Sequence, residues 1–586
     1  MVQVYKEGYL EHMMAKVLEM IPCRITNYIR LTPTLKKVLL DIFIVLFVYN
    51  ILRAVFHTTI GHLDNSIYFS SSFFLSSFKN ISFLLLFGVV MLLLSYNYRI
   101  ISWKKFSDYK VLKVLVFAIV FPIFWEQFFY DYNFYLNTDS FIDKGFLLLF
   151  MILLFIHPLF AFMVLTLGYI FFHSITFPFD SEGSHMPEFT AIYHILLLFV
   201  SFLMVKSIKK FNHIDTKLFI FLALTIHASN YFIPGVAKIE ISPNGWEWAF
   251  TNEINNLFIS AHINGWFGFL TEERSLQIVN YLNHIDILFT LSNMFIQLGA
   301  IFLLYNRRVS LWMFSIFELF HIGIMFMSGI IFWQWVILNL GFLYAIKHLS
   351  KENIKFLYNR KMFAVFVVIV ALSPIIYRPF IFAWWDSNFN TIYDVYIVTD
   401  DNKSIKLNSQ DISPYDEMFA QNALISFIDK EPTLINNRGI LLKDINPYSN
   451  SFYLLLDYIK DENKEKSPFY NKSFIIYKAL EKAESVDDVK RVLKEYGHSI
   501  YSEKKRKIFK EFLQTYFRNY NKKGQKSPFY KKFGAPYMLY DFTPSGLEKS
   551  PQVDHIEIFK SNIWYNKKTM TVVSFDHKKI MDIPIK

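Results

Sequence analysis

The sequence predicts a mainly α-helical protein: a polytopic transmembrane helix bundle of about nine or ten membrane segments, including one hairpin or re-entrant element, then a soluble α+β C-terminal domain. Composition is the first observation behind this prediction. Of 586 residues, 53% are hydrophobic and 65 are Phe, well above the values of soluble domains. The second observation is a series of long apolar runs before residue 381. The third is a polar tail with alternating, strand-like stretches.

Residues 1–35 are expected to form a cytoplasmic amphipathic segment. Lys, Arg and Glu are spread through it, and it lacks an early apolar core followed by a small-residue cleavage site. A removable signal peptide is therefore not expected. The single cysteine, Cys23, lies here, so the chain offers no intramolecular disulfide and no thiolate metal cluster.

Residues 36–381 are predicted to form the transmembrane domain. An apolar run can cross roughly 30 Å of hydrocarbon when it is about 20 residues long. The candidate runs are 38–56, 81–97, 111–131, 145–175, 191–206, 217–237, 278–305, 309–328, 329–347 and 361–380.

The loops between these runs predict the orientation. Basic clusters at 36–37, 99–105, 206–210, 307–308 and 347–361 mark the cytoplasmic side. The loops 131–144 and 176–190 are acidic or neutral and should lie outside, so the segment between them must enter and return. Pro158 in "IHPLF" supplies a break for that hairpin.

The same parity places Lys238, the loop 239–277 and the tail 382–586 on the outer side. The tail reads as one extracytoplasmic α+β domain, with strand-like runs at 394–407 and 569–585 and helix-like runs near 415–430 and 477–520. We therefore expect a multi-pass protein of the cell (inner) membrane with a cytoplasmic N-terminus and the lipid bilayer as a partner. The formal charge of +11 comes mostly from loops and tail, so nucleic acid is not an expected partner.

The stretch "YFIPGVAKIEISPNGWEWAF" (231–250) ends one apolar run with a lysine. Helical spacing puts His227, Asn230, Tyr231 and Lys238 near one side. Pro234 with Gly235 is predicted to break the helix and to permit close approach by a ligand or another helix. One interpretation is a lysine that reaches to the lipid headgroups. The other is a desolvated amine that acts as a base.

Further ionisable residues lie inside apolar runs, where they usually face the bundle interior. They are Glu126, His157, His173, Asp286, Glu318 and His321. Glu318 and His321 are three residues apart and share a helix face. Each histidine can be a hydrogen-bonded packing group or a functional one. No metal site is predicted, because no HxxxH or HxxEH spacing occurs in this region.

Two stretches resemble a known family. "YFIPGVAKI" followed by "GWEWAF", and "FHIGIMFMSGIIF" at 320–332, are similar to the signature of the vitamin K-dependent gamma-carboxylase and its bacterial relatives with the horizontally transferred transmembrane (HTTM) domain. In hydropathy the likeness covers about residues 35–350. The resemblance implies a helix bundle that opens to the extracytoplasmic side, with a soluble C-terminal domain on that side.

The resemblance also implies an enzyme. A lysine deprotonates a reduced quinone (vitamin K or menaquinol-like), the quinone anion reacts with O2, and the resulting strong base removes a γ-proton from a glutamate that captures CO2. The expected partners are then a lipid quinone and an exported peptide or protein. Lys238 occupies the position of the lysine, and His157, followed by His173, best matches an upstream catalytic histidine.

We expect a substrate or cofactor pocket lined by His173, His227, Tyr231, Gly235, Trp246, Glu318 and His321. The sequence departs from the family where a second lysine is frequent, because Ala237 stands there. It also lacks the cysteine pairing of animal members and a recognisable propeptide-binding signature. A non-catalytic membrane scaffold or maturation factor that binds a client through its tail is the alternative, and a transporter ranks third.

Overall fold

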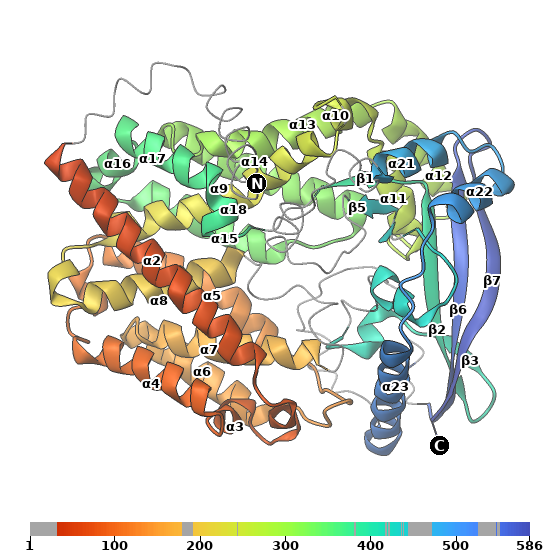
Figure 1. The fold of residues 1–586 in the computed structure, drawn as a ribbon, viewed down its shortest axis with the longest axis horizontal. Coiled ribbons are helices and arrows are strands. Elements are labelled where there is room, and N and C mark those ends of the chain that lie inside the picture. The colour runs from red at the N-terminus through yellow and green to blue at the C-terminus, as the bar shows by residue number, and fades with distance from the viewer. Residues whose placement is uncertain are drawn as a thin grey trace, which may run out of the picture.

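The structure is a computed structural model that describes residues 32–177, 191–242, 244–379, 383–415, 419, 422–434, 436–437, 439–442, 472–524, 547 and 551–585. The chain is mainly helical with a C-terminal sheet region, as predicted. In Figure 1 the helix bundle fills one side of the molecule, and β2, β6 and β7 stand with α23 on the other. Nearly all of the predicted cytoplasmic segment 1–35, with Cys23, lies outside the described residues.

Among the described residues, four helices are long and apolar enough to span a membrane. They are α2 (Pro33–Gly61), α5 (Tyr109–Phe128), α9 (Thr216–Glu240) and α14 (Arg307–Ser328). A fifth candidate is the pair α12 (Glu272–Asn283) and α13 (Asp286–Gly299), which is bent by 66° at the break between the two helices.

The prediction of nine or ten spans is not supported within the described residues. The other apolar runs form helices of only 12 to 17 residues, namely α4 (Ile81–Tyr96), α6 (Phe141–Ile156), α7 (Phe160–Thr176), α8 (Ala191–Ser207), α15 (Trp333–His348) and α17 (Arg360–Ala371). For α15 and α17 the run includes apolar residues of the adjoining turns and so exceeds the helix, whereas the runs at α4 and α8 match helices that are themselves short. Short helices complete the rest: α3 (Phe73–Ser77), α10 (Glu247–Thr251), α11 (Ile254–Ile263), α16 (Lys351–Leu357) and α18 (Ser373–Ile376).

The run 145–175 is divided as the proline predicted. Helix α6 ends at Ile156, α7 begins at Phe160, and the two helices pack against each other. Pro158 lies between them and cannot donate a backbone hydrogen bond to a continuing helix.

Helix α9 is the central helix of the bundle. Within its most apolar window 89% of the residues are buried, against 33% for α2 and 22% for α14. The outer helices therefore carry exposed apolar side chains such as Phe43, Trp312 and Leu319, as expected of helices that face lipid. Position in the bundle, and not hydropathy, distinguishes α9 from its neighbours.

The described part of the C-terminal region has two antiparallel sheets. The larger has the strand order β3-β2-β6-β7, and the smaller has the order β1-β5-β4. Their bounds are β1 (Trp384–Asp386), β2 (Phe389–Thr399), β3 (Ser404–Lys406), β4 (Asn436–Asn437), β5 (Ile440–Leu442), β6 (Val553–Asn566) and β7 (Thr571–Pro584). The predicted strands at 394–407 and 569–585 correspond to β2–β3 and β7.

Three helices accompany these sheets: α21 (Lys472–Glu481), α22 (Val486–Tyr496) and α23 (Glu503–Lys523). They divide the predicted helical stretch 477–520. The stretch predicted near 415–430 is different, because its described part 422–428 forms 3-10 turns.

The loop between α5 and α6 joins the bundle to the C-terminal region. Phe134 is fully buried there, with its ring 5.3 Å from that of Tyr516 and 5.4 Å from that of Tyr520 on α23. The Asn133 side chain donates to the Tyr415 hydroxyl at 2.9 Å. The boundary predicted at residue 382 therefore does not separate two independent cores.

Candidate functional site

Lys238 lies in the last turn of α9 with its side chain fully buried. Its Nζ donates a 3.0 Å hydrogen bond to Gln297 Oε1 on α13. The amine lies 5.2 Å from the ring centroid of Trp248 and 5.0 Å from that of Trp384. Lys238 forms no ion pair with any residue that the structure describes. An enclosed amine without an adjoining carboxylate is unusual, because a buried charge is costly unless it is paired.

Local hydrogen bonds fix the walls around this amine. The Ser242 hydroxyl donates to the Lys238 carbonyl at 2.8 Å and accepts from the backbone N–H of Trp248 at 2.9 Å. The Trp248 indole then donates to the Trp384 carbonyl at 2.6 Å. Because Trp384 begins β1, the C-terminal region supplies one wall of the lysine site.

The predicted break at Pro234 and Gly235 is wrong. Helix α9 continues through both residues to Glu240. A Cβ at Gly235 would lie 3.0 Å from the Gln297 Cβ and 3.1 Å from the Leu298 backbone nitrogen. The glycine therefore allows α13 to approach closely, and tertiary packing outweighs the helix-breaking tendency of the proline.

A second cluster lies about 10 Å along the helix axis from Lys238, since seven residues separate Tyr231 from the lysine. The Tyr231 ring stacks on Phe317 at 3.8 Å, and its hydroxyl lies 3.4 Å from His321 Nε2. The His227 ring centroid lies 5.2 Å from that of Tyr231. The structure thus brings together three of the predicted pocket residues.

Asn339 on α15 completes this cluster. Its amide donates to the Tyr231 hydroxyl at 3.3 Å, and it also faces His227 and Glu318. Both ring nitrogens of His227 are buried without a hydrogen bond of ordinary geometry to the described part of the chain. Such buried polar atoms are rare and are candidates for contact with a ligand.

His157 is not brought to the lysine. It lies at the end of α6, with Nε2 2.9 Å from the Tyr98 carbonyl in the loop between α4 and α5. In the same loop, the Ser107 N–H bonds Asp215, the residue before α9 begins. Lys238 is 23 residues beyond Asp215, or about 35 Å along the helix axis. His157 and Lys238 therefore lie at opposite ends of the bundle and cannot share one catalytic site.

Two other predicted residues need correction. His173 lies in the last turn of α7, a helix that packs mainly on α5, α6 and α8 and not on α9. Trp246 is 40% exposed and lies against Phe295, whereas Trp248 covers the lysine. The Ser242 hydroxyl bonds the Trp248 backbone near the start of α10. This bond places the second tryptophan of "GWEW", and not the first, over the lysine.

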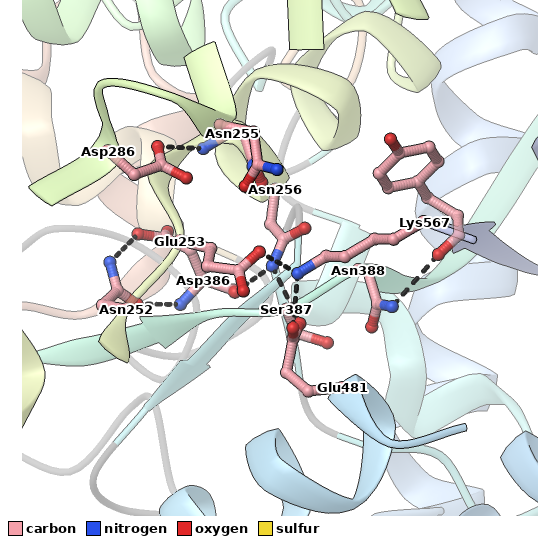
Figure 2. Close-up of polar contacts among 12 residues, drawn as sticks. Asn252, Glu253, Asn255, Asn256, Asp286, Asp386, Ser387, Asn388, Glu481 and Lys567 are labelled. Atoms are coloured by element: carbon pink, nitrogen blue, oxygen red, sulfur yellow. Dashed lines mark hydrogen bonds and ion pairs between the residues drawn. The ribbon is translucent and has the colours of Figure 1, made fainter. Parts of the chain in front are cut away.

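Asp386, at the end of β1, extends the site into the C-terminal region (Figure 2). Its carboxylate accepts hydrogen bonds from the Asn252 amide at 2.7 Å and from the Trp384 indole at 3.0 Å. Its backbone N–H donates to Asn252 Oδ1 at 2.8 Å. Burial raises the pKa of Asp386 to about 6, although Asn252, Trp384 and Lys238 all favour its ionised form.

We use the name interface polar cluster for Asn252, Glu253, Asn256, Asp386, Glu481 and Lys567. The Asn256 amide donates to the Asp386 carbonyl at 2.8 Å and to the Glu481 carboxylate at 3.1 Å. Lys567, from the β6–β7 hairpin, bridges the carboxylates of Glu253 and Glu481 (Figure 2). Burial is the main cause that raises the pKa of Glu481.

Sequence reasoning missed this cluster as well as Gln297 and Asn339. A signal was present in "NEINN" at 252–256 and in "WWD" at 384–386. Neither stretch lies within an apolar run, whereas the ionisable residues that the sequence singles out all lie in such runs.

One group on the C-terminal sheet could hold a metal ion. A ligand atom each from His555, Glu557 and Asp582 lies within 4.8 Å of the others. The Lys579 amine bonds Glu557 at 2.9 Å and Asp582 at 3.0 Å. In this arrangement the two carboxylates belong to an ion pair with the lysine.

Comparisons with known protein families, curated proteins and solved structures give no match to this chain.

Proposed function

We propose that this protein is a membrane enzyme of the vitamin K-dependent gamma-carboxylase type, with Lys238 as the general base. The observation that supports the proposal is the fully buried Lys238 amine, which has a neutral amide, Gln297, as its hydrogen-bond partner. Base lysines in enzymes are typically desolvated and free of an adjoining counter-ion. The lysine site also excludes water through Trp248 and Trp384, which protects reactive intermediates.

We infer that the head group of a quinone binds at the cluster around Tyr231. Flat rings from Phe317, Trp335 and Tyr231 offer stacking surfaces, and the His227 and His321 imidazoles can bond ring oxygens. When bound, the reduced quinone supplies the electrons that O2 accepts. The role of this chain is to orient the ring, keep water away and remove a proton from the quinol oxygen at Lys238 Nζ. The remaining substrates would be CO2 and a glutamate side chain of an exported peptide.

We also propose that the C-terminal region lies outside the cell membrane and the N-terminus inside. The basic loops 99–105 and 206–210 lie at the end of the bundle opposite Lys238, where cytoplasmic loops are expected. The shorter helices α4, α6, α7 and α8 would add crossings to those of the four long helices. An exported substrate would then approach from the side of the lysine site.

The direct test compares wild-type membranes with the variants Lys238→Met and Lys113→Met. Methionine keeps the apolar stem of the lysine but removes the base. Lys113 is half-buried and bonds a backbone carbonyl at the opposite end of the bundle, so it controls for the loss of one positive charge. We expect Lys238→Met to insert normally into the membrane but to abolish quinol oxidation. The 44 Da that carboxylation adds to a glutamate of the substrate should also be lost. Full activity in that variant would refute the proposal.

The alternative is a maturation factor that binds a client without catalysis. It is favoured by an open cleft of about 530 Å³ between α23 and β7, whose lining includes Arg506, Lys507, Lys510 and Lys579. In that case Lys510→Glu would reduce client capture in a pull-down. Lys238→Met would leave the cellular phenotype unchanged.

A further inference from the structure

The interface polar cluster connects the buried lysine site with the protein surface (Figure 2). Asp386 is buried, with 2% of the residue exposed, whereas the side chains of Glu481 and Glu253 are 13% and 29% exposed. The ionisable groups thus form a graded series between Lys238 and solvent.

A base that takes up a proton must release it before the next turnover. Around Lys238, the Gln297 amide and the faces of Trp248 and Trp384 have no site that accepts a proton at neutral pH. Asp386 is the ionisable group whose charge acts on Lys238. It is also the first carboxylate beyond the tryptophan wall, because the Trp384 indole bonds it directly.

The surroundings of Asp386 come from four elements. Lys238 faces it from α9, Asp286 from α13 and Tyr477 from α21. From the segment before α11, Asn252 holds both the carboxylate and the backbone N–H. Lys238 is the cation among these neighbours. A proton that passes from the Lys238 ammonium to the Asp386 carboxylate therefore neutralises both groups.

We propose that Asp386 accepts the proton that Lys238 takes up, and that the pair of Glu253 and Glu481 passes it to solvent. This inference rests on the proposed function of Lys238 as a base. One N–H bond breaks at Lys238 Nζ, one O–H bond forms on Asp386, and the proton finally enters bulk water, so no further reactant is needed. A bridging water can carry the proton between side chains that are not in direct contact.

Three residues position this route. Asn252 and Trp384 fix the Asp386 carboxylate, and Asn256 ties the Asp386 backbone to Glu481. The pKa of Asp386, which burial raises to about 6, suits a group that must both gain and lose a proton near neutral pH.

The test measures the first turnover and the steady state separately in the purified full-length protein. Asp386→Asn keeps the shape of the side chain but cannot take up the proton. We expect a normal first turnover of quinol oxidation and a steady-state rate at least tenfold lower. Formate, a small diffusible carboxylate, should restore most of the steady-state rate. A purely structural role would lower both phases together and would not respond to formate.

A second pair of variants tests the same proton route at a residue other than Asp386. Glu481→Gln should also slow the steady state, by a smaller factor, because solvent lies near. Glu484→Gln is the matched control, since Glu484 is exposed and pairs with Lys568 outside the cluster, and it should behave as wild type.

The outcomes separate the two proposals. An unchanged steady state in Asp386→Asn, with activity that is lost in Lys238→Met, would overturn the proton route and leave the proposed function intact. Loss of both phases in Asp386→Asn without formate rescue would overturn it too. A wild-type protein without any quinol-dependent activity would refute the proposed function, and the route with it.

Discussion

Gln297 on α13 accepts a hydrogen bond from Lys238 on α9 at 3.0 Å, and both side chains are buried. This bond joins a neutral acceptor to an amine that forms no ion pair with the described residues. The neutral amide at position 297 therefore influences whether Lys238 is a neutral amine or an ammonium ion.

Gln297→Glu would convert this neutral contact into an ion pair. A carboxylate beside Lys238 favours the ammonium form, which cannot act as a base. We expect quinol oxidation to fall at least tenfold while the midpoint of thermal unfolding, Tm, stays equal or rises. Gln297→Met, which supplies no anion, should keep more activity than Gln297→Glu. The reverse order would contradict the proposed role of the neutral acceptor.

Gly235→Ala should destabilise the protein. The new Cβ would meet the Leu298 backbone nitrogen at 3.1 Å, and backbone cannot move aside as a flexible side chain does. Overpacking of this kind costs about 1–3 kcal/mol. Gly323→Ala on α14 is the matched control, because nothing lies within 4 Å of its Cβ, and it should gain roughly 0.5 kcal/mol. Thermal unfolding of the two variants in detergent measures the difference.

Asp386 should make stability depend on pH between about 4 and 6. An unperturbed aspartate has a pKa of 3.8, and burial is the main cause that raises the pKa of Asp386 to about 6 in the folded protein. The stability that Asp386 contributes is therefore full below pH 4 and is lost as the pH rises through 6. At about 1.4 kcal/mol per pKa unit, the difference corresponds to roughly 3 kcal/mol.

Asp386→Asn removes this dependence. The Tm of the variant relative to wild type should therefore rise between pH 4 and pH 7. Asp487→Asn, an exposed position of α22, controls for the loss of one carboxyl group. A Tm difference that stays constant over this range would show that Asp386 does not titrate there.

Lys567→Met should weaken the contact between the bundle and the C-terminal region. It leaves the carboxylates of Glu253 and Glu481 without the amine that bridges them, at a cost of about 2 kcal/mol. The neighbouring ion pair of Lys568 and Glu484 is 66% exposed on both sides, so Lys568→Met should have little effect. Limited proteolysis of the segment 252–256 checks whether the contact has opened. Equal protection in both variants would contradict the bridging role.

Apolar composition and long apolar runs were sufficient to predict a helical bundle, and the alternating runs of the polar tail were sufficient to predict a C-terminal sheet region. These features did not give the number of long helices, because the short apolar runs of α4 and α8 were counted as spans and the turn residues beside α17 are as apolar as the helix itself. The break at Pro158 was predicted from the backbone donor that proline lacks, and α6 does end at Ile156 before it. Pro234 differs because α8, α13 and α17 surround α9 and hold it straight.

Within the site, helical spacing correctly grouped His227 and Tyr231, whose ring centroids lie 5.2 Å apart, while the pairing of Glu318 with His321 stays a prediction. The grouping succeeded because it depends on one helix. Gln297, Asn339 and Asp386 come from other segments, and only the packing of distant helices brings them to α9. The match of His157 rested on distance along the chain, which does not reveal at which end of a helix a residue lies.

The insertion of Phe134 into the core beside α23 has a consequence for biogenesis. The α5–α6 loop is synthesised more than 300 residues before α23. Its aromatic rings therefore cannot pack against α23 until the intervening helices have been made. Contacts of such long sequence separation form slowly. The C-terminal residues 382–586 are thus not a detachable module, since any excised version would lack side chains that belong to its own interior.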